Sequence, residues 1–365
     1  MHPQFFEIPF VHLTVKSYGM MMVVGFLVAL PVIKHLSRDI TPNPSYIINA
    51  ALYSLIAGVV GARVFFVVHY FDQFRDRPLS VFSIWEGGLE FYGGLLAMVV
   101  ILIYLRYHKL PIRHYLDIFA IGLMLALAFG RIGCFLNGCC FGKPTNLPWG
   151  VCFPYGSFTY RSQVHPNPQR GRPVPQLELP ADFFGYRDEN GRYWQDLKPL
   201  QELTAQQHEL VTNGKYCCLP VHPTQLYSSA KAGLICILLY FFWKRSQRAE
   251  RIGNFQGILT KPGSTFALAF VLYGVARFLM EFLRDDNPFE VDSLTVSQLI
   301  GILMVVLGVA LIAVFAVSES EKVPVRAGRL SQNNRPERVV EDEESSGQKN
   351  TRRSQHRRKG NSPLT

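Results

Sequence analysis

Seven long runs of apolar residues constrain the fold of this chain more than any other feature of its sequence. A helix needs about 20 mostly apolar residues to span a bilayer, because only a helix satisfies its own backbone hydrogen bonds in hydrocarbon. The runs are Ser17–Ile33, Tyr46–Tyr70, Leu89–Leu105, Leu116–Ile132, Leu226–Trp243, Ser264–Leu283 and Ser297–Val317. Buried helices of a soluble protein would carry a polar face at helical spacing, which Gln298–Val317 lacks. We therefore expect an all-α integral membrane protein with seven transmembrane helices.

Basic residues in the short loops predict the direction of crossing. Lys and Arg favour cytoplasmic loops, and they gather after the first, third and fifth runs. These residues are Lys34, Arg38, Arg106, Lys109, Arg113, Lys244, Arg245, Arg248, Arg251 and Lys261. The N-terminus is therefore expected outside and the C-terminus in the cytoplasm. The first run has no basic flank before it and no small-residue cleavage signal after it, so we expect a retained helix rather than a signal peptide.

Two segments stand apart from the predicted helices of the membrane domain, residues 1–317. Residues 143–221 are rich in Pro, Gly, Tyr and Trp, and the order of the spans places them outside as a partly ordered insertion. Residues 318–365 hold eleven Lys or Arg and seven Asp or Glu but few large apolar residues, which predicts a disordered cytoplasmic tail. The net charge of +10 thus reflects the tail and the loops, and no nucleic-acid partner is expected.

Polar residues within the predicted spans gather at one depth. Ionisable residues are costly in hydrocarbon and are candidates for function. With the directions given above, the outer halves of six helices hold Tyr18, Arg63, Glu90, Tyr92, Arg131, His222, Gln225, Lys231, Arg277 and Glu281. A transporter or channel would place such groups near the midplane or along a path to both sides, whereas the inner half holds little beyond Asp117. The pattern favours an enzyme that takes an amphiphilic substrate from the outer leaflet.

Arginines exceed carboxylates at this depth. The arginines are Arg63, Arg131 and Arg277, and the carboxylates are Glu90 and Glu281. Tyr273, Arg277 and Glu281 repeat at i, i+4 and i+8 on one helix face, and an ion pair within that helix is the simpler alternative for Arg277 and Glu281. Such an ion pair leaves Arg63 and Arg131 unexplained. Because the planar guanidinium binds phosphate oxygens bidentately, the excess predicts a site for an anionic phospholipid headgroup.

Taken together, the motifs of the chain resemble the prolipoprotein diacylglyceryl transferase family. Six segments carry the resemblance in the family's order, from about residue 12 to residue 317. They are Ser17-Tyr18-Gly19, Gly61-Ala62-Arg63, Gly87–Gly94, Gly130–Gly142, His222-Pro223-Thr224-Gln225-Leu226-Tyr227 and Tyr273–Phe278. The resemblance implies a seven-helix inner-membrane enzyme. Such an enzyme transfers the diacylglyceryl group of phosphatidylglycerol to the lipobox cysteine of a prolipoprotein, which forms a thioether and releases glycerol phosphate.

The resemblance also implies functional residues. The family's important positions fall on Tyr18, Arg63, Arg131, Asn137, Gly142, His222, Tyr273, Arg277 and Glu281. We expect catalytic roles for Arg131, Arg277, Tyr92 and Glu281. Substrate-binding roles are expected for Tyr18, Arg63, Asn137, Gly142, His222, Gln225 and Tyr273. In this hypothesis, Arg131 and Arg277, with Arg63, neutralise the leaving phosphate while a thiol attacks the adjacent glycerol carbon.

Two departures from the family's pattern leave the general base open. The family often has a histidine where this chain has Tyr92, and often Asn and an acidic residue where it has Cys134 and Cys139. A tyrosine, with an ordinary pKa of about 10, is a poor base unless nearby arginines lower its pKa. Glu90, Glu281 and His222 are alternatives. A phospholipid-binding or transport protein of the same fold is the competing interpretation.

No metal or organic cofactor is expected, because the lipid donor already carries a leaving group. Six of the seven cysteines lie on the predicted outer side, namely Cys134, Cys139, Cys140, Cys152, Cys217 and Cys218. Disulfides form outside the cytoplasm, and one that joins Cys217 or Cys218 to Cys139 or Cys140 would fasten the insertion. The cysteines lack paired Cys-x-x-Cys units, which argues against a metal site.

Overall fold

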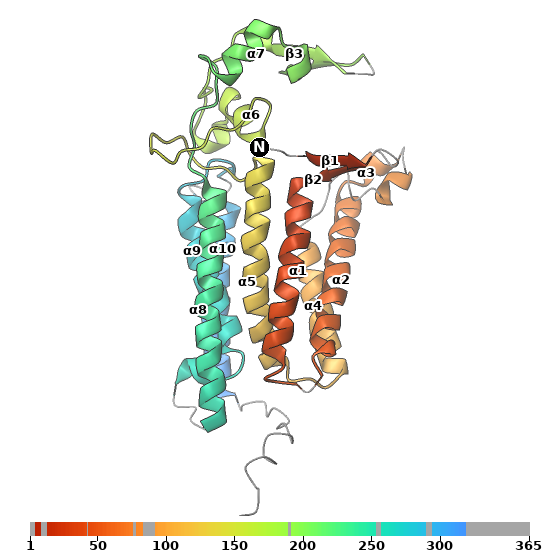
Figure 1. The fold of residues 1–365 in the computed structure, drawn as a ribbon, viewed down its shortest axis with the longest axis vertical. Helices are drawn as coiled ribbons and strands as arrows, with labels where there is room; N and C mark the ends of the chain where they lie inside the picture. Colours follow the sequence, from red (N-terminus) through yellow and green to blue (C-terminus); the bar gives the residue numbers. More distant parts are fainter. Residues whose placement is uncertain are drawn as a thin grey trace, which may run out of the picture. The chain divides into compact units, whose positions relative to one another are not determined.

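The computed structural model describes residues 4–8, 13–41, 43–75, 78–82, 92–188, 191–252, 257–289 and 294–318, and this part of the chain is mostly helical (Figure 1). Within it, six helices are long and apolar enough to cross a membrane. They are α1 (Ser17–Ser37), α2 (Ser45–His69), α5 (Ile112–Asn137), α8 (Thr224–Ile252), α9 (Ser264–Glu281) and α10 (Val296–Val317). These helices confirm the prediction of a mostly helical membrane protein.

The seventh predicted span coincides with a shorter helix. α4 (Tyr92–Tyr107) has 16 residues, fewer than the roughly 20 that a bilayer requires. The predicted run begins at Leu89, but residues 83–91, which include Glu90 and the first part of the Gly87–Gly94 motif, lie outside the described residues. The number of spans and the direction of crossing therefore stay predictions, and so does the disordered tail, of which only Ser318 is described.

α5 is the central helix of the bundle. It packs against α1, α8 and α9, while α9 packs against α10 and α2 packs against α4 (Figure 1). The core between the helices includes Ile33, Ile47, Ile118, Ile121, Leu239 and Trp243. On the outside, α10 exposes Leu303, Val306 and Val309. Soluble proteins rarely present a continuous apolar surface of this kind, which instead suits contact with lipid.

The connection between α5 and α8 is a folded insertion. It contains α6 (Phe158–Val164), α7 (Ala205–Thr212) and an antiparallel hairpin of β3 (Phe184–Arg187) and β4 (Tyr193–Leu197). Its core consists of Phe141, Phe153, Tyr160, Val164, Leu177, Leu197, Cys218 and Val221. The buried Tyr160 hydroxyl donates a hydrogen bond of 2.7 Å to the carbonyl of Tyr216. The insertion is therefore more ordered than the sequence predicts.

Short elements complete the described part of the chain. β1 (Gln4–Ile8) and β2 (Leu13–Lys16) form an antiparallel hairpin before α1. The others are α3 (Phe71–Phe74), η1 (Pro78–Phe82), η3 (Pro168–Arg170), η4 (Ala181–Phe183), η5 (Leu200–Glu202) and η6 (Ile258–Thr260). The apolar runs anticipate neither hairpin, because each strand has only four or five residues.

The carboxylate in the predicted inner half of the bundle has a structural role. Asp117 of α5 is 2% exposed. Its two oxygens accept hydrogen bonds from the backbone N–H groups of Gly263, at 2.8 Å, and Phe266, at 2.7 Å. These groups belong to the N-terminus of α9, where N–H groups lack partners within the helix and negative charge is stabilising. Asp117 therefore caps α9 from the neighbouring helix.

Asp117→Ala should destabilise the protein, because it leaves two buried N–H groups of α9 without acceptors. We expect a loss of about 2 to 6 kcal/mol, since each unsatisfied buried group costs about 1 to 3 kcal/mol. Thermal unfolding of the purified protein in detergent measures the loss. Asp117→Asn keeps one carbonyl oxygen and should lose less. Unchanged unfolding of the alanine variant would contradict the capping role.

Candidate functional site

A buried carboxylate at the end of α9 organises the polar residues of the bundle. Glu281 is 1% exposed. Its Oε2 accepts a hydrogen bond from Arg277 Nη1 at 2.7 Å, and its Oε1 accepts from Asn287 Nδ2 at 2.8 Å and from Arg170 Nη2 at 3.3 Å. Arg284 Nε lies 3.9 Å from Oε2. A buried charge is costly unless it is paired and hydrogen-bonded, and Glu281 meets both conditions.

Arg277 is held from two sides. Besides the bond to Glu281 within α9, its Nη2 donates a hydrogen bond of 2.5 Å to Ser297 Oγ at the start of α10. Its side chain is mostly buried, with 13% exposed. A guanidinium has five N–H donors in a rigid fork, so these two contacts fix its orientation and leave donors for another acceptor.

Arg284 follows α9 and lies beside the loop that leaves α5. Its Nε and Nη2 donate to the two carboxylate oxygens of Asp286 at 2.9 and 2.6 Å. A β-bridge joins Arg284 to Gly142. Burial opposes the charge on Arg284, but its hydrogen bonds to Asp286 prevail and raise the pKa of the guanidinium above its usual range. Arg284 is thus a fixed, permanently charged group.

Arg131 and Lys231 complete a group of cations that we call the cationic cluster. Arg131 of α5 interacts electrostatically with Arg284 and Tyr273. Lys231 of α8 interacts with Arg131, Arg277 and Arg284. Its Nζ lies 5.3 Å from the centre of the Tyr273 ring and donates a hydrogen bond of 3.3 Å to a carbonyl of α9. The cationic cluster therefore consists of Arg131, Lys231, Arg277 and Arg284.

Positive charge exceeds negative charge in this cluster. Among the described residues, its carboxylate contacts are Glu281 and Asp286, so two charges balance four. Among the residues that the structure describes, Arg131 makes no hydrogen bond or ion pair with a carboxylate, and it is only partly buried. Four cations at close range repel one another unless an anion joins them. The geometry therefore suits a polyvalent anion such as phosphate, with Arg131 as the group free to meet it.

Tyr18 and Tyr273 border the cationic cluster. Tyr18 lies in the first turn of α1, is 43% exposed, and interacts electrostatically with Arg131. Gly133 of α5 lets α1 approach, because a Cβ at that position would lie 3.2 Å from the Cα of Tyr18. Tyr273 interacts with both Arg131 and Arg277. Both hydroxyl groups thus come from helices that pack against α5.

Three predicted binding residues instead hold the loop that follows α5. Gly142 N–H donates to the His222 carbonyl at 3.1 Å, and a Cβ on Gly142 would lie 2.7 Å from both the Cβ and the carbonyl oxygen of His222. Only glycine permits this approach. Gln225 Nε2 donates to the Cys139 carbonyl at 2.7 Å. Nδ1 of the His222 ring lies 3.5 Å from the hydroxyl oxygen of Tyr227. These residues position the loop beside the cluster.

The described contacts of Arg63 and Asn137 lie outside the cationic cluster. Arg63 of α2 is 6% exposed and donates to the carbonyls of Ser80 and Val81 in η1, at 2.6 and 2.8 Å. The hydrogen bonds described for Arg63 thus go to backbone carbonyls, whereas those of Arg277 go to the side chains of Glu281 and Ser297. Asn137 lines a pocket of about 350 Å³ that residues 153–158 and Arg161 of the insertion complete. The side chain of Tyr92 lies outside the described residues.

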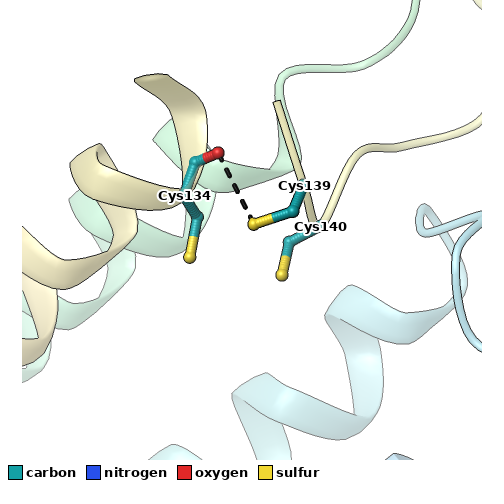
Figure 2. A group of neighbouring side chains, drawn as sticks. All are labelled: Cys134, Cys139 and Cys140. Atoms are coloured by element: carbon teal, nitrogen blue, oxygen red, sulfur yellow. Dashed lines mark hydrogen bonds between the residues drawn. The ribbon is translucent and has the colours of Figure 1, made fainter. Parts of the chain in front are cut away.

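The described cysteines include a candidate set of metal ligands. The ligand sulfurs of Cys134, Cys139 and Cys140 all lie within 4.8 Å of one another (Figure 2). All seven cysteines of the chain are thiols. The disulfide expected between Cys217 or Cys218 and this loop is therefore absent, and both residues interact electrostatically with Cys152 instead.

Three contributors to this site, Arg284, Arg170 and Lys231, are not among the site residues that the sequence predicts. Continuing the repeat of Tyr273, Arg277 and Glu281 by three residues reaches Arg284, so the helical spacing held a signal for it. Arg170 follows no such pattern, because the fold of the insertion alone brings it to Glu281.

Known proteins resemble the chain over most of its length. The family model for prolipoprotein diacylglyceryl transferase matches residues 3–314. A protein of Clostridium tetani named phosphatidylglycerol-prolipoprotein diacylglyceryl transferase is 27% identical over 310 residues, which cover 85% of this chain and 96% of that protein. Proteins of the same name from Burkholderia ambifaria and Xanthomonas oryzae are 28% and 30% identical. The first covers 85% of this chain and 95% of its own length, and the second covers 75% of each.

Glu281→Gln should destabilise the protein, because it removes the charge that compensates the arginines buried around it. Breaking a buried ion pair by removing one partner costs about 3 to 5 kcal/mol, and we expect a loss near the lower limit because the amide oxygen still accepts a hydrogen bond. Thermal unfolding in detergent measures the loss. Glu178→Gln, at an exposed position of the insertion, is the matched control. Equal stability of the two variants would refute the central role of Glu281.

Proposed function

Because the chain belongs to the prolipoprotein diacylglyceryl transferase family, we propose that it transfers the diacylglyceryl group of phosphatidylglycerol to the lipobox cysteine of prolipoproteins. The names of its relatives contain both substrates. The reaction forms a thioether, releases glycerol phosphate and is the first step of bacterial lipoprotein maturation. The observation that carries the proposal is the excess of cations in a cluster built from α5, α8 and α9.

The cationic cluster binds the phosphate of the lipid. Arg131 meets the phosphate oxygens directly, and Arg277 adds the donors that Glu281 and Ser297 leave unused. As the thiol attacks the glycerol carbon, the bond from that carbon to the phosphate oxygen breaks and negative charge grows on the leaving group. Fixed donors stabilise such charge without reorganisation. Arg284 and Lys231 supply positive charge at close range, while Tyr18 and Tyr273 orient the headgroup.

Glu281 acts as a positioning residue in this mechanism. It is buried and receives hydrogen bonds from Arg277, Arg170 and Asn287. A carboxylate that is 1% exposed and already accepts three hydrogen bonds is out of reach of an incoming thiol. The general base is therefore sought among Tyr92, Glu90 and His222, of which only the side chain of His222 is described.

We place the reaction at the outer leaflet of the bacterial cytoplasmic membrane. In this arrangement, α4 with the residues before it completes the seventh span, the N-terminus lies outside, and the C-terminus lies in the cytoplasm. The start of α1 and the ends of α5 and α9 lie at the same end of the bundle as the insertion (Figure 1), which supports a single depth for the site. A prolipoprotein, held in the bilayer by its signal helix, enters laterally between helices.

Arg131→Ala and Arg277→Ala should each lower turnover by at least about 100-fold, the usual cost of removing one donor to a developing charge. The assay combines purified protein, phosphatidylglycerol and a lipobox peptide, and mass spectrometry detects the thioether-linked lipid. Arg245→Ala removes an exposed arginine of α8 that lies away from the cluster and should retain full turnover. Near-normal turnover of either cluster variant would refute the phosphate assignment.

The wild-type chain should restore lipoprotein modification in bacteria depleted of their own transferase. Labelling with a radioactive fatty acid measures the modified lipoproteins. The Arg131→Ala variant, produced at the same level in membranes, should fail to restore them. If the wild-type protein binds phosphatidylglycerol vesicles but restores no modification, the chain is a lipid-binding or transport protein rather than a transferase.

A further inference from the structure

Three thiols gather beside the cationic cluster, and the reaction proposed above uses none of them. Cys134 lies near the end of α5, and Cys139 and Cys140 lie in the loop that follows. Figure 2 shows the three side chains next to one another, with the Cys139 thiol directed toward the Cys134 carbonyl oxygen, and the three sulfurs lie within 4.8 Å of one another. An ion that makes metal–sulfur bonds of about 2.3 Å holds its sulfurs about 4 Å apart. Small rotations of these side chains reach that separation.

The backbone of the loop is fixed in a way that presents the thiols. Thr224 Oγ1 donates to the Cys140 carbonyl and Gln225 Nε2 donates to the Cys139 carbonyl, both at 2.7 Å. Cys140 has a φ of 61°, in the left-handed region that residues with a Cβ rarely adopt. Glycine would adopt this conformation at lower cost. The chain nevertheless has a cysteine at this position, where its backbone is strained. Such local strain is typical of functional positions.

Positive charge lies beside the three sulfurs, and the thiolate is the form of cysteine that binds metals. Arg284 and Arg131 both interact electrostatically with Cys140. The same two arginines would balance the negative charge of a complex in which three thiolates surround one monovalent cation. The cationic cluster thus compensates the electrostatic cost of three neighbouring thiolates.

We propose that Cys134, Cys139 and Cys140 bind Cu⁺. Soft thiolates select soft cations, chiefly Cu⁺ and Zn²⁺. Zn²⁺ in structural sites almost always takes four protein ligands, whereas this group contains three sulfurs and, among the described residues, no histidine or carboxylate within the same distance. Cu⁺ accepts three sulfurs. On binding, Cu⁺ replaces the thiol protons, which pass to the solvent, and no electron is transferred.

This proposal revises the expectation drawn from the cysteine spacing. The order Cys134, Cys139, Cys140 contains no Cys-x-x-Cys unit. The end of α5 and the left-handed turn at Cys140 bring the residues together instead. The three ligands are distinct from the cations and tyrosines assigned to the lipid, although Arg131 and Arg284 lie near both sites.

Titration of the reduced, detergent-purified protein with Cu⁺ under anaerobic conditions, in competition with the chelator bicinchoninate, tests the site. We expect one Cu⁺ per chain. Cys140→Ser and Cys134→Ser should each weaken binding at least about tenfold, a change of about 1.4 kcal/mol. Cys152→Ser and Cys236→Ser, which alter cysteines outside the group, should bind like the wild type. X-ray absorption of the loaded protein should report three sulfur neighbours.

Several results would overturn the proposal. Absence of Cu⁺ binding by the wild type, or unchanged binding after replacement of all three cysteines, would exclude the site. Tighter binding of Zn²⁺ in a parallel titration would refute the choice of ion. Peptide mapping of unreduced protein that finds a disulfide within the group would assign the thiols to oxidation instead. Cys139→Ala, with its unfolding temperature measured in parallel, separates loss of ligand from loss of fold.

Discussion

The contact between Glu281 and its arginines is the interaction on which the site depends. Glu281 belongs to α9, but the groups that surround it come from α9 itself, from the segment after α9, and from the insertion. In the interior of a protein, Coulomb interactions are several times stronger than in water, so one carboxylate orients several guanidinium groups. Arg277 is the member with donors left over, and its orientation is therefore set before any substrate arrives.

Charge balance favours an anion at the proposed site. Glu281 and Asp286 neutralise part of the cationic cluster and fix the geometry of Arg277 and Arg284. Arg131 and Lys231 come from other helices and lack carboxylate contacts among the described residues. The fold thus separates cations that carboxylates hold from cations that have no carboxylate contact among the described residues.

Hydropathy and helical spacing predict part of this arrangement, because both are local properties. The apolar runs locate six long helices, and the spacing on α9 places Tyr273, Arg277 and Glu281 on one face. The role of Arg63 could not be predicted, since its hydrogen bonds to η1 depend on a turn between helices. Nor could the contact of Arg170 with Glu281, since 111 residues separate them.

The ion pair between Arg170 and Glu281 makes the insertion more than a cover for the end of the bundle. Arg170 also stacks on Phe289, 4.7 Å from its ring centre, and Arg172 pairs with Asp285 at 3.4 Å. The insertion is therefore fastened to the segment that holds Arg277 in place. A change in the position of the insertion would therefore disturb the contacts of Glu281, the residue that holds Arg277.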